Sequence, residues 1–324
     1  MAIVANTFTR YGAKGLREEL SDVIYDISPM ETPIISAAGR MSVSQTLHEW
    51  QTDALSVTDT ANAQLEGDDI ATFPAVTPTV RVGNYTQISR KLVIISGTLD
   101  EVNKAGRASE LAYQVSRRGR EIKRDMESIV TENLGGDAGG TATARQTATL
   151  GAWLKTNVDK AGDGGNPVYT SGVPSAARTD GSQRAITETI FKNVLETMWT
   201  SGADINATTV YCGPFNKQAI SAFTGVVTRN YDISNTPRPT AVISAVDVFV
   251  SDFGTVRIQP TRFQRERDVW FIDPEYISLG VLRPFQLIEL AKTGDAEKRM
   301  MLQEWSLCVK QEAALGLAAD LNAS

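Results

Sequence analysis

Histidine and cysteine are nearly absent from this chain, and their scarcity excludes several kinds of functional site. The 324 residues include one histidine, His48, and two cysteines, Cys212 and Cys308. Two cysteines so far apart in the sequence exclude a disulfide framework and a cysteine-ligated zinc site. We expect Cys212 to be a half-buried structural thiol, and His48, which lies in an alternating stretch, to sit on the surface of a strand.

The sequence signatures of the common enzyme chemistries are missing as well. The chain contains no GxSxG, GK[ST], HExxH or GxGxxG motif. Its glycine-rich stretches between residues 135 and 184 lack the flanking strand and helix of a phosphate-binding loop, so we interpret them as surface loops. The acidic run of residues 66–69 is interpreted as a loop tip instead of a metal site. We therefore expect no catalytic residues, no metal and no cofactor.

An excess of positive charge and long apolar runs are also lacking. The chain has 32 basic and 38 acidic residues, which give a formal net charge of −6. This balance argues against a protein that coats DNA through a global positive field. No apolar run approaches the roughly 20 residues of a membrane-spanning helix, and the first residues do not form an export signal. We expect a globular protein with no membrane partner.

The first region of the chain, residues 1–41, is predicted to be an arm. Apolar residues at helical spacing predict an amphipathic helix over residues 14–27. Pro29 and Pro33 follow it, so we expect the chain to leave that helix in an extended conformation. A single helix with extended flanks cannot bury its own apolar stripe, so the arm must lie on the rest of the chain or on a neighbour.

The second region, residues 42–96, is predicted to be a long two-stranded ribbon. Residues 43–56 and 79–95 are rich in the β-branched and aromatic residues that strands prefer. Because an isolated ribbon is only marginally stable in water, we expect a partner to cover it. Between the two arms lies a polar tip with four acidic residues, namely Asp59, Glu66, Asp68 and Asp69.

The third region, residues 97–184, contains the strongest helical signal. A long amphipathic helix is predicted over residues 107–134, with Gly135 and Gly136 as its end. Its apolar stripe includes Ile122 and Met126. The opposite face is expected to carry charges paired at i,i+4 spacing: Arg117, Arg118, Arg120, Lys123, Arg124 and Asp125, with the pairs Arg117/Glu121 and Lys123/Glu127.

The last two regions, residues 185–283 and 284–324, have a mixed α+β pattern. The former is predicted to hold two helices, 186–200 and 215–223, and strands at 208–212, 242–250, 256–259, 269–272 and 276–281. The latter is predicted to form two strands, 285–290 and 300–309, joined by a turn at Thr293-Gly294-Asp295, and then a helical turn over 312–321.

The order of these parts resembles the major capsid proteins of tailed double-stranded DNA bacteriophages, which share the Hong Kong 97-type fold. Four stretches strengthen the resemblance: residues 17–29 (REELSDVIYDISP), 48–53 (HEWQTD), 82–88 (VGNYTQI) and 123–127 (KRDME). The resemblance implies an α+β fold with an N-terminal arm (1–41), an extended β-hairpin E-loop (42–96), a P domain with a spine helix and glycine-rich loop (97–184), an A domain (185–283) and closing P-domain strands (284–324).

The resemblance also implies a structural function and a set of partners. Such subunits form pentamers and hexamers of an icosahedral shell around the genome, and they assemble in the host cytoplasm with a scaffolding protein and a portal. A decoration protein and non-specific contact with packaged DNA are further implied partners. Intersubunit ion pairs are expected between the acidic tip and the long helix, each contributing roughly 0–1 kcal/mol, and their candidates are Asp59, Glu66, Asp68, Asp69, Arg117, Arg118, Arg120 and Arg124.

Two departures from other family members follow from the same resemblance. Some members crosslink their subunits through an E-loop lysine, but residues 59–78 contain no lysine and the nearest is Lys91. We therefore expect no covalent crosslink. The predicted ribbon begins by residue 42, which leaves no room for a fused scaffold, so we expect the scaffolding protein to be a separate chain.

The sequence is also compatible with two other functions. An encapsulin-type compartment protein has the same fold and encloses an enzyme instead of DNA. An α+β enzyme using Glu66, Asp68 or Asp69 as acid–base groups is a third hypothesis, disfavoured because an exposed tip does not exclude water. The basic residues of the long helix face either packaged DNA or, as we favour, their own acidic neighbours.

Overall fold

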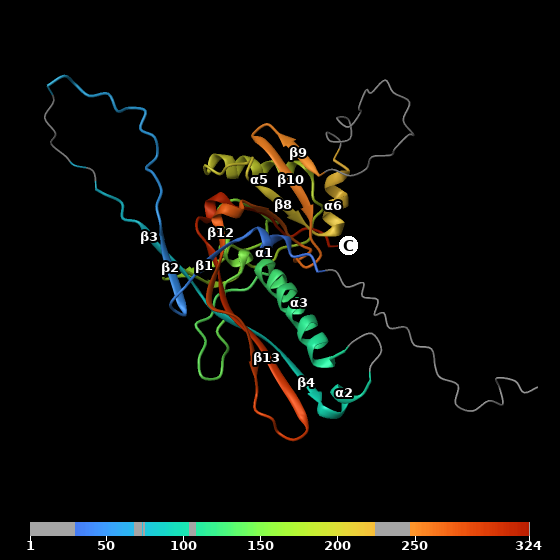
Figure 1. The fold of residues 1–324 in the computed structure, drawn as a ribbon. Coiled ribbons are helices and arrows are strands. Elements are labelled where there is room, and N and C mark those ends of the chain that lie inside the picture. Colours follow the sequence, from blue (N-terminus) through green and yellow to red (C-terminus); the bar gives the residue numbers. More distant parts are fainter. Residues whose placement is uncertain (1–29, 68–72, 74, 104–107, 224–246, 324) are drawn as a thin grey trace, which may run out of the picture.

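The fold consists of an α+β body from which one long ribbon projects (Figure 1). The computed structural model describes residues 30–67, 73, 75–103, 108–223 and 247–323. Its helices are α1 (Pro33–Ala37), α2 (Gly97–Glu101), α3 (Glu110–Thr131), α4 (Leu150–Trp153), α5 (Glu188–Thr200) and α6 (Pro214–Ser221), with 3-10 turns η1 (Pro274–Tyr276) and η2 (Glu312–Ala314). The expected helix over residues 14–27 lies outside the described residues, as do Asp68 and Asp69.

The strands form four sheets. A four-stranded sheet has the order β1-β12-β13-β4, a six-stranded sheet has the order β5-β14-β11-β8-β10-β9, and β2-β3 and β6-β7 are two-stranded. The bounds are β1 (Gly39–Ser42), β2 (Leu47–Thr52), β3 (Val80–Tyr85), β4 (Gln87–Ser96), β5 (Val158–Asp159), β6 (Val168–Thr170), β7 (Val173–Ala176), β8 (Thr209–Cys212), β9 (Val248–Ser251), β10 (Gly254–Pro260), β11 (Val269–Ile272), β12 (Ile277–Glu289), β13 (Ala296–Val309) and β14 (Gly316–Ala318).

The long helix α3 is confirmed, although it is shorter than predicted at both ends. The Ser109 side chain caps its first turn by accepting a hydrogen bond from the backbone N–H of Ala112 (3.3 Å). The helix ends at Thr131, before Gly135 and Gly136, because the chain turns there to lie against β7. Its 22 residues span about 33 Å.

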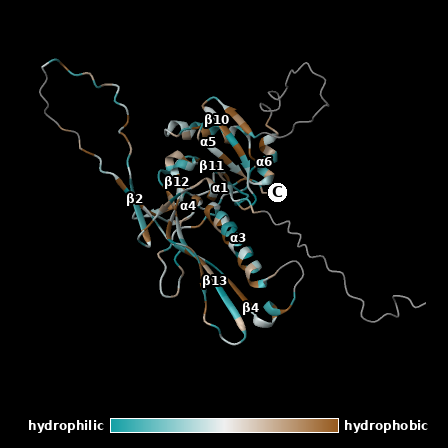
Figure 2. Cartoon of the chain, viewed as in Figure 1, coloured by the Kyte–Doolittle hydropathy of each residue, from teal (hydrophilic) through white to brown (hydrophobic). Residues whose placement is uncertain are grey.

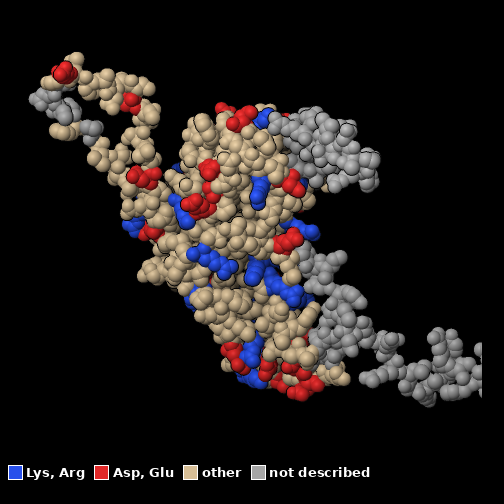
Figure 3. All heavy atoms as spheres, turned by 45° about the horizontal axis from the view of Figure 1, so that its top comes forward, with Lys and Arg blue, Asp and Glu red and all other residues tan. Residues whose placement is uncertain are grey.

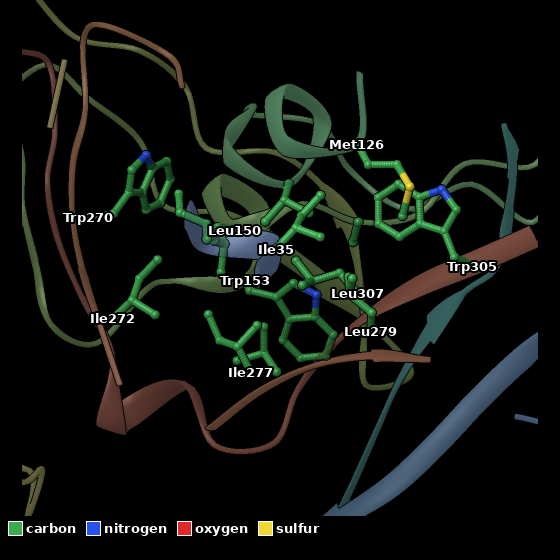
Figure 4. Close-up of a cluster of buried hydrophobic side chains, with 14 of the residues drawn as sticks. Ile35, Met126, Leu150, Trp153, Trp270, Ile272, Ile277, Leu279, Trp305 and Leu307 are labelled. Carbon is green, nitrogen blue, oxygen red and sulfur yellow. The ribbon is translucent and has the colours of Figure 1, made fainter. Parts of the chain in front are cut away.

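The four-stranded sheet packs against α3 and joins distant parts of the sequence. Strand β13 lies antiparallel to both β12 and β4, and β1 runs parallel to β12. The core between the sheet, α1, α3 and α4 includes Ile35, Met126, Trp153 and Trp305, all of them buried (Figure 4). One strand, β12, runs across residue 283, the predicted boundary between the last two regions.

The predicted ribbon is confirmed in part. Strands β2 and β3 pair antiparallel, from Leu47 opposite Tyr85 to Thr52 opposite Val80. The prediction that its second arm continues to residue 95 is wrong, because β4 pairs with β13 instead. The physical reason is side-chain burial: Val93 and Ile95 on alternate positions of β4 are buried on the side of α3.

The six-stranded sheet and helices α5 and α6 form the second core. The predicted α5, β8 and β11 are confirmed, and Gly202 with φ +90° follows the end of α5. The predicted helical turn over residues 312–321 is wrong beyond its first residues. Gly316 begins strand β14 there, and a Cβ on it would lie 2.5 Å from the Met198 sulfur of α5. The small residues of β14, Gly316 and Ala318, allow α5 to approach the six-stranded sheet closely.

The expectation of an extended chain around Pro33 is also wrong. Pro33 is the first residue of helix α1, a position where proline lacks only an N–H that has no intrahelical partner. Ile34 and Ile35 of this helix are buried in the body. The chain is therefore anchored in the core at the point where residues 1–29 join it.

Candidate assembly surfaces

The loop between β2 and β3 exposes apolar side chains far from the body. Figure 2 shows hydrophobic stretches along this projecting loop. A soluble monomer rarely leaves a group of large apolar residues uncovered. The exposed fractions on this loop are 99% for Leu55, 93% for Val57, 81% for Leu65, 80% for Phe73 and 91% for Val76. This loop has the composition of a surface that contacts another molecule.

Two of the acidic tip residues, Asp59 and Glu66, are described, and they lie on the same loop. Asp59 accepts a hydrogen bond from the backbone N–H of Ala61 (2.8 Å), and Glu66 is exposed. Among the described residues, the salt bridges do not include either side chain. The face drawn in Figure 3 shows acidic groups and no basic ones along the outer part of the loop. Within a single chain, Asp59 and Glu66 are therefore not paired with the described arginines of α3.

The four arginines predicted on α3 occupy its outer face, and each has a neighbour within the chain. Arg117 and Arg118 form ion pairs with Glu121 at 3.4 and 2.6 Å. Arg120 contacts the Met30 sulfur at 3.4 Å. Burial acts to raise the pKa of Glu121, but the hydrogen bond and charge of Arg118, with other cations nearby, hold it below its usual range. Arg124 lies over the ring of Phe263.

The predicted pair Lys123/Glu127 is wrong, because Glu127 faces the core and not the solvent. Its carboxylate is fully buried and accepts hydrogen bonds from the backbone N–H groups of Ile34 (2.9 Å) and Ile35 (2.8 Å). These two donors belong to the first turn of α1, which has no preceding carbonyls to bind. Burial raises the pKa of Glu127, although both hydrogen bonds act in the opposite direction. Glu127 thus links α3 to α1.

The histidine and the cysteines occupy structural positions. Cys212 and Cys308 are free and fully buried, and burial raises the pKa of each thiol to about 12. Their thiolates are therefore scarce near neutral pH, which is unfavourable for nucleophilic chemistry. His48 lies on β2 as predicted, with its ring 5.5 Å from that of Trp50, and partial burial lowers its pKa. The described residues contain no cluster of potential metal ligands.

A carboxylate that sequence reasoning missed joins three separate segments. Glu304 on β13 accepts hydrogen bonds from Nε of Arg283 (2.7 Å) and from the hydroxyl of Thr86 (3.0 Å), and it also pairs with Arg145. Its side chain is 5% exposed. The four residues are distant in sequence, so the only available signal was an acidic residue within an apolar strand. This cluster fixes the β3–β4 connection to the four-stranded sheet.

A second buried ion cluster, also missed, fastens the C-terminal residues. Arg178 donates hydrogen bonds to Asp268 and to Asp320, the latter at 3.2 Å, and all three side chains are almost fully buried. Burial raises the pKa of Asp268 against the opposing charges of Arg178 and Arg265.

In the described part of the chain, no helix is long and apolar enough to cross a membrane.

Two solved structures with a similar fold come from protein shells. The capsid subunit of Cyanophage A-1(L) superposes with a TM-score of 0.67 over 95% of this chain and 98% of that chain, at 10% identity. The SrpI encapsulin of Synechococcus elongatus PCC 7942 gives a TM-score of 0.54 over 96% and 94%, also at 10% identity. These identities establish the fold alone, and that fold is the Hong Kong 97-type fold predicted from the sequence.

Comparisons of sequence identify the family more specifically than comparisons of fold. It is 40% identical over 145 residues to the major capsid protein of Escherichia phage Phieco32, an alignment that covers 45% of this chain and 40% of that relative. The chain thus matches about two fifths of that relative's length. The family model for the SU10 major capsid protein matches residues 3–322, almost the full sequence. This chain therefore belongs to the SU10 major capsid protein family.

Proposed function

We propose that this chain is the structural subunit of an icosahedral phage capsid, assembled as pentamers and hexamers around double-stranded DNA. The proposal rests on family membership and, in the structure, on one observation above all. The β2–β3 loop carries five large apolar side chains that are at least 80% exposed. Such a surface is stable in water when another molecule covers it.

A second copy of the chain offers an apolar surface that suits this loop. Alternate residues of the edge strand β4 lie on the sheet face opposite α3. Three of them are exposed to 46%, 53% and 65%, namely Ile88, Leu92 and Ile94. A loop from one copy that covers this stripe on the next copy makes a head-to-tail contact. Contacts of this type close into rings when the rotation between copies is right.

Light scattering and negative-stain electron microscopy of the purified chain at micromolar concentration test the proposal. We expect uniform shells, or pentamers and hexamers that close into shells when a scaffolding protein is supplied. A 35.1 kDa monomer that stays monomeric with the scaffolding protein would contradict a capsid function. It would also reopen the enzyme hypothesis.

An encapsulin-type compartment is the second candidate, because the fold is shared with an encapsulin shell. The contents of the particle separate the two functions. Particles isolated from infected cells should contain nuclease-protected DNA if the chain forms a capsid. Particles that instead contain one co-purifying enzyme would support the compartment. The family match and the higher TM-score of the cyanophage capsid favour the capsid.

Several finer expectations are part of the same proposal. Residues 59–78 lack lysine, so mature particles boiled in detergent should release a single 35.1 kDa band instead of crosslinked ladders. Assembly in the host cytoplasm with a separate scaffolding protein and a portal, a decoration protein on the outside and non-specific contact with DNA inside belong to this proposal too. The acidic tip and the arginines of α3 are its candidate intersubunit contacts.

A further inference from the structure

Hairpin β6–β7 has a turn that only a narrow set of residues can form. Its two strands are joined by Ser171 and Gly172, with φ values of 51° and 81°. Positive φ at both central residues is typical of the type I′ turn, which matches the twist of a tight hairpin. The hairpin forms a sheet of its own, separate from both large sheets.

The tip of this hairpin touches the backbone of the ribbon. The N–H of Gly83 on β3 donates a hydrogen bond to the carbonyl of Gly172 (3.1 Å). A Cβ on Gly172 would lie 2.2 Å from the carbonyl oxygen of Arg81, also on β3. No side chain fits into that space, so glycine is required for the contact as well as for the turn.

The other end of the hairpin is fixed to the body. The N–H of Gly136, after α3, donates to the carbonyl of Pro174 on β7 (2.7 Å). A Cβ on the neighbouring Gly135 would lie 2.5 Å from the carbonyl oxygen of Ser175. The hairpin therefore spans from the end of α3 to β3, with close backbone contact at both ends.

A line of aromatic rings makes a second connection between the hairpin and the ribbon. The Tyr169 hydroxyl on β6 donates a hydrogen bond to the carbonyl of Trp153, and its ring meets the Trp153 ring edge-on at 5.9 Å. Trp153, only 2% exposed, stacks on Trp50 of β2 with ring centroids 5.4 Å apart. The rings thus join hairpin, body and ribbon in series.

Beside these contacts the base of the ribbon is open. A cleft of about 480 Å³ lies there, lined among others by Pro78, Val80, Trp153 and Tyr169. Among the described strands, β2 and β3 pair only with each other. Asn84 holds the lower end of β3 through hydrogen bonds to Ala148 and Leu307. Above that anchor, the hairpin contact, the Trp50 stack and the buried Val82 side chain oppose a swing of the ribbon into the cleft.

We propose that hairpin β6–β7, together with the series of rings Tyr169, Trp153 and Trp50, is a brace that sets the angle at which the ribbon leaves the body, with Gly172 and Trp50 as the positioning residues. The brace itself is a property of the single chain. Its consequence for shell formation rests on the proposed function, because a ribbon at the wrong angle cannot reach its contact on the next copy.

The test is a distance measured between the ribbon and the body. Spin labels are attached to Q51C on β2 and E196C on α5, both exposed positions. The native Cys212 and Cys308 are buried and remain unlabelled. Pulsed electron resonance of the unassembled subunit then gives the distance distribution. In Gly172→Ala we expect the distribution to broaden and its mean to shift, because the new Cβ displaces β3.

Gly294→Ala is the matched control. Gly294 also has a positive φ, +79°, but no atom lies within 4 Å of the position of its Cβ. This control carries the same backbone strain without pushing on a neighbour, and it should leave the distance unchanged. A Gly172→Ala distribution identical to that of the parent would overturn the brace, whatever its shells look like.

Trp50→Leu provides a second variant if Gly172→Ala does not fold. It removes the stack on Trp153 without any backbone strain, and the brace predicts a broader ribbon–body distance. An unchanged distribution would contradict the proposal. Shell formation by the parent chain is scored separately by electron microscopy, so a failure of the capsid function is distinguishable from a failure of the brace.

Discussion

The body and the ribbon hold the same classes of apolar residue in opposite surroundings. In the body, Phe191 and Trp305 are 0% exposed, whereas Leu55 and Phe73 of the ribbon loop are 99% and 80% exposed. The body buries its apolar residues in two cores and can be stable by itself. The ribbon has two strands and no core, and such a hairpin gains little stability alone. With the proposed function, the comparison predicts that stability and assembly reside in different parts of this chain.

A core substitution should have the largest effect on stability. Phe191 lies in the six-stranded half, with ring centroids 4.9 Å from both Phe249 and Phe271. Phe191→Ala should lower the free energy of unfolding by about 3–5 kcal/mol, because it leaves a cavity in a packed core. Urea denaturation of the unassembled subunit measures this change, with Phe191→Leu as a milder control. A loss below about 1 kcal/mol would mean that this core is not close-packed.

Substitution of Glu127, the buried carboxylate of α3, should have an effect of intermediate size on stability, and this effect should depend on pH. Burial raises the pKa of Glu127 above its ordinary 4.5. The folded state therefore binds a proton before the unfolded state does, and stability rises as the pH falls through the raised pKa toward 4.5. Thermal denaturation across this range should show the parent gaining stability relative to Glu127→Gln.

Asp125→Asn is the control for this experiment, since Asp125 is a more exposed carboxylate two residues away on the same helix. Parallel pH curves for the parent and Glu127→Gln would show that Glu127 does not titrate differently in the folded state.

A substitution on the outer face of α3 should change the free energy of unfolding only slightly. The Arg117 side chain is 61% exposed and pairs with Glu121. Exposed pairs of this type contribute little because water and salt screen them. Arg117→Ala should change the free energy of unfolding by no more than about 0.5 kcal/mol. A larger loss in chemical denaturation would mean that this face is part of the folded body and not a surface available to a neighbour.

The smallest effect on stability is expected where the effect on assembly is greatest. The double variant Leu55→Ser/Phe73→Ser should leave the unfolding of the subunit unchanged within about 0.5 kcal/mol and should prevent shells from forming. Leu55→Met/Phe73→Leu keeps the loop apolar and should still assemble. If the serine variant forms normal shells, the exposed loop is not an assembly contact.

Helices whose apolar residues repeat at a clear helical spacing were predictable from the sequence. Helix α3 and helix α5 bury one stripe each, so their 3.6-residue pattern is local information. The hairpin of β12 and β13 was marked by Gly294, whose φ of +79° suits a turn. The resemblance to capsid proteins, which came from the order of such elements, led to the correct family and fold.

Features that depend on long-range contacts were not predictable. Strands β3 and β4 have similar composition, and only the tertiary position of β13 separates them into two sheets. Glu127 has the sequence environment of a solvated residue, and its burial depends on α1, more than 90 positions away. The candidate contacts Asp59, Glu66 and the α3 arginines remain predictions, because a single chain contains only one side of each contact.

The four-stranded sheet also constrains how the chain is made. Its strands come from residues 39–42, 87–96, 277–289 and 296–309, so β4 pairs with residues some 200 positions later. Contacts of such long range form late and slow folding. During synthesis, β4 and its exposed apolar stripe have no partner strand until β13 has left the ribosome. The sheet that supports the ribbon is thus completed only after residue 309 has been synthesised.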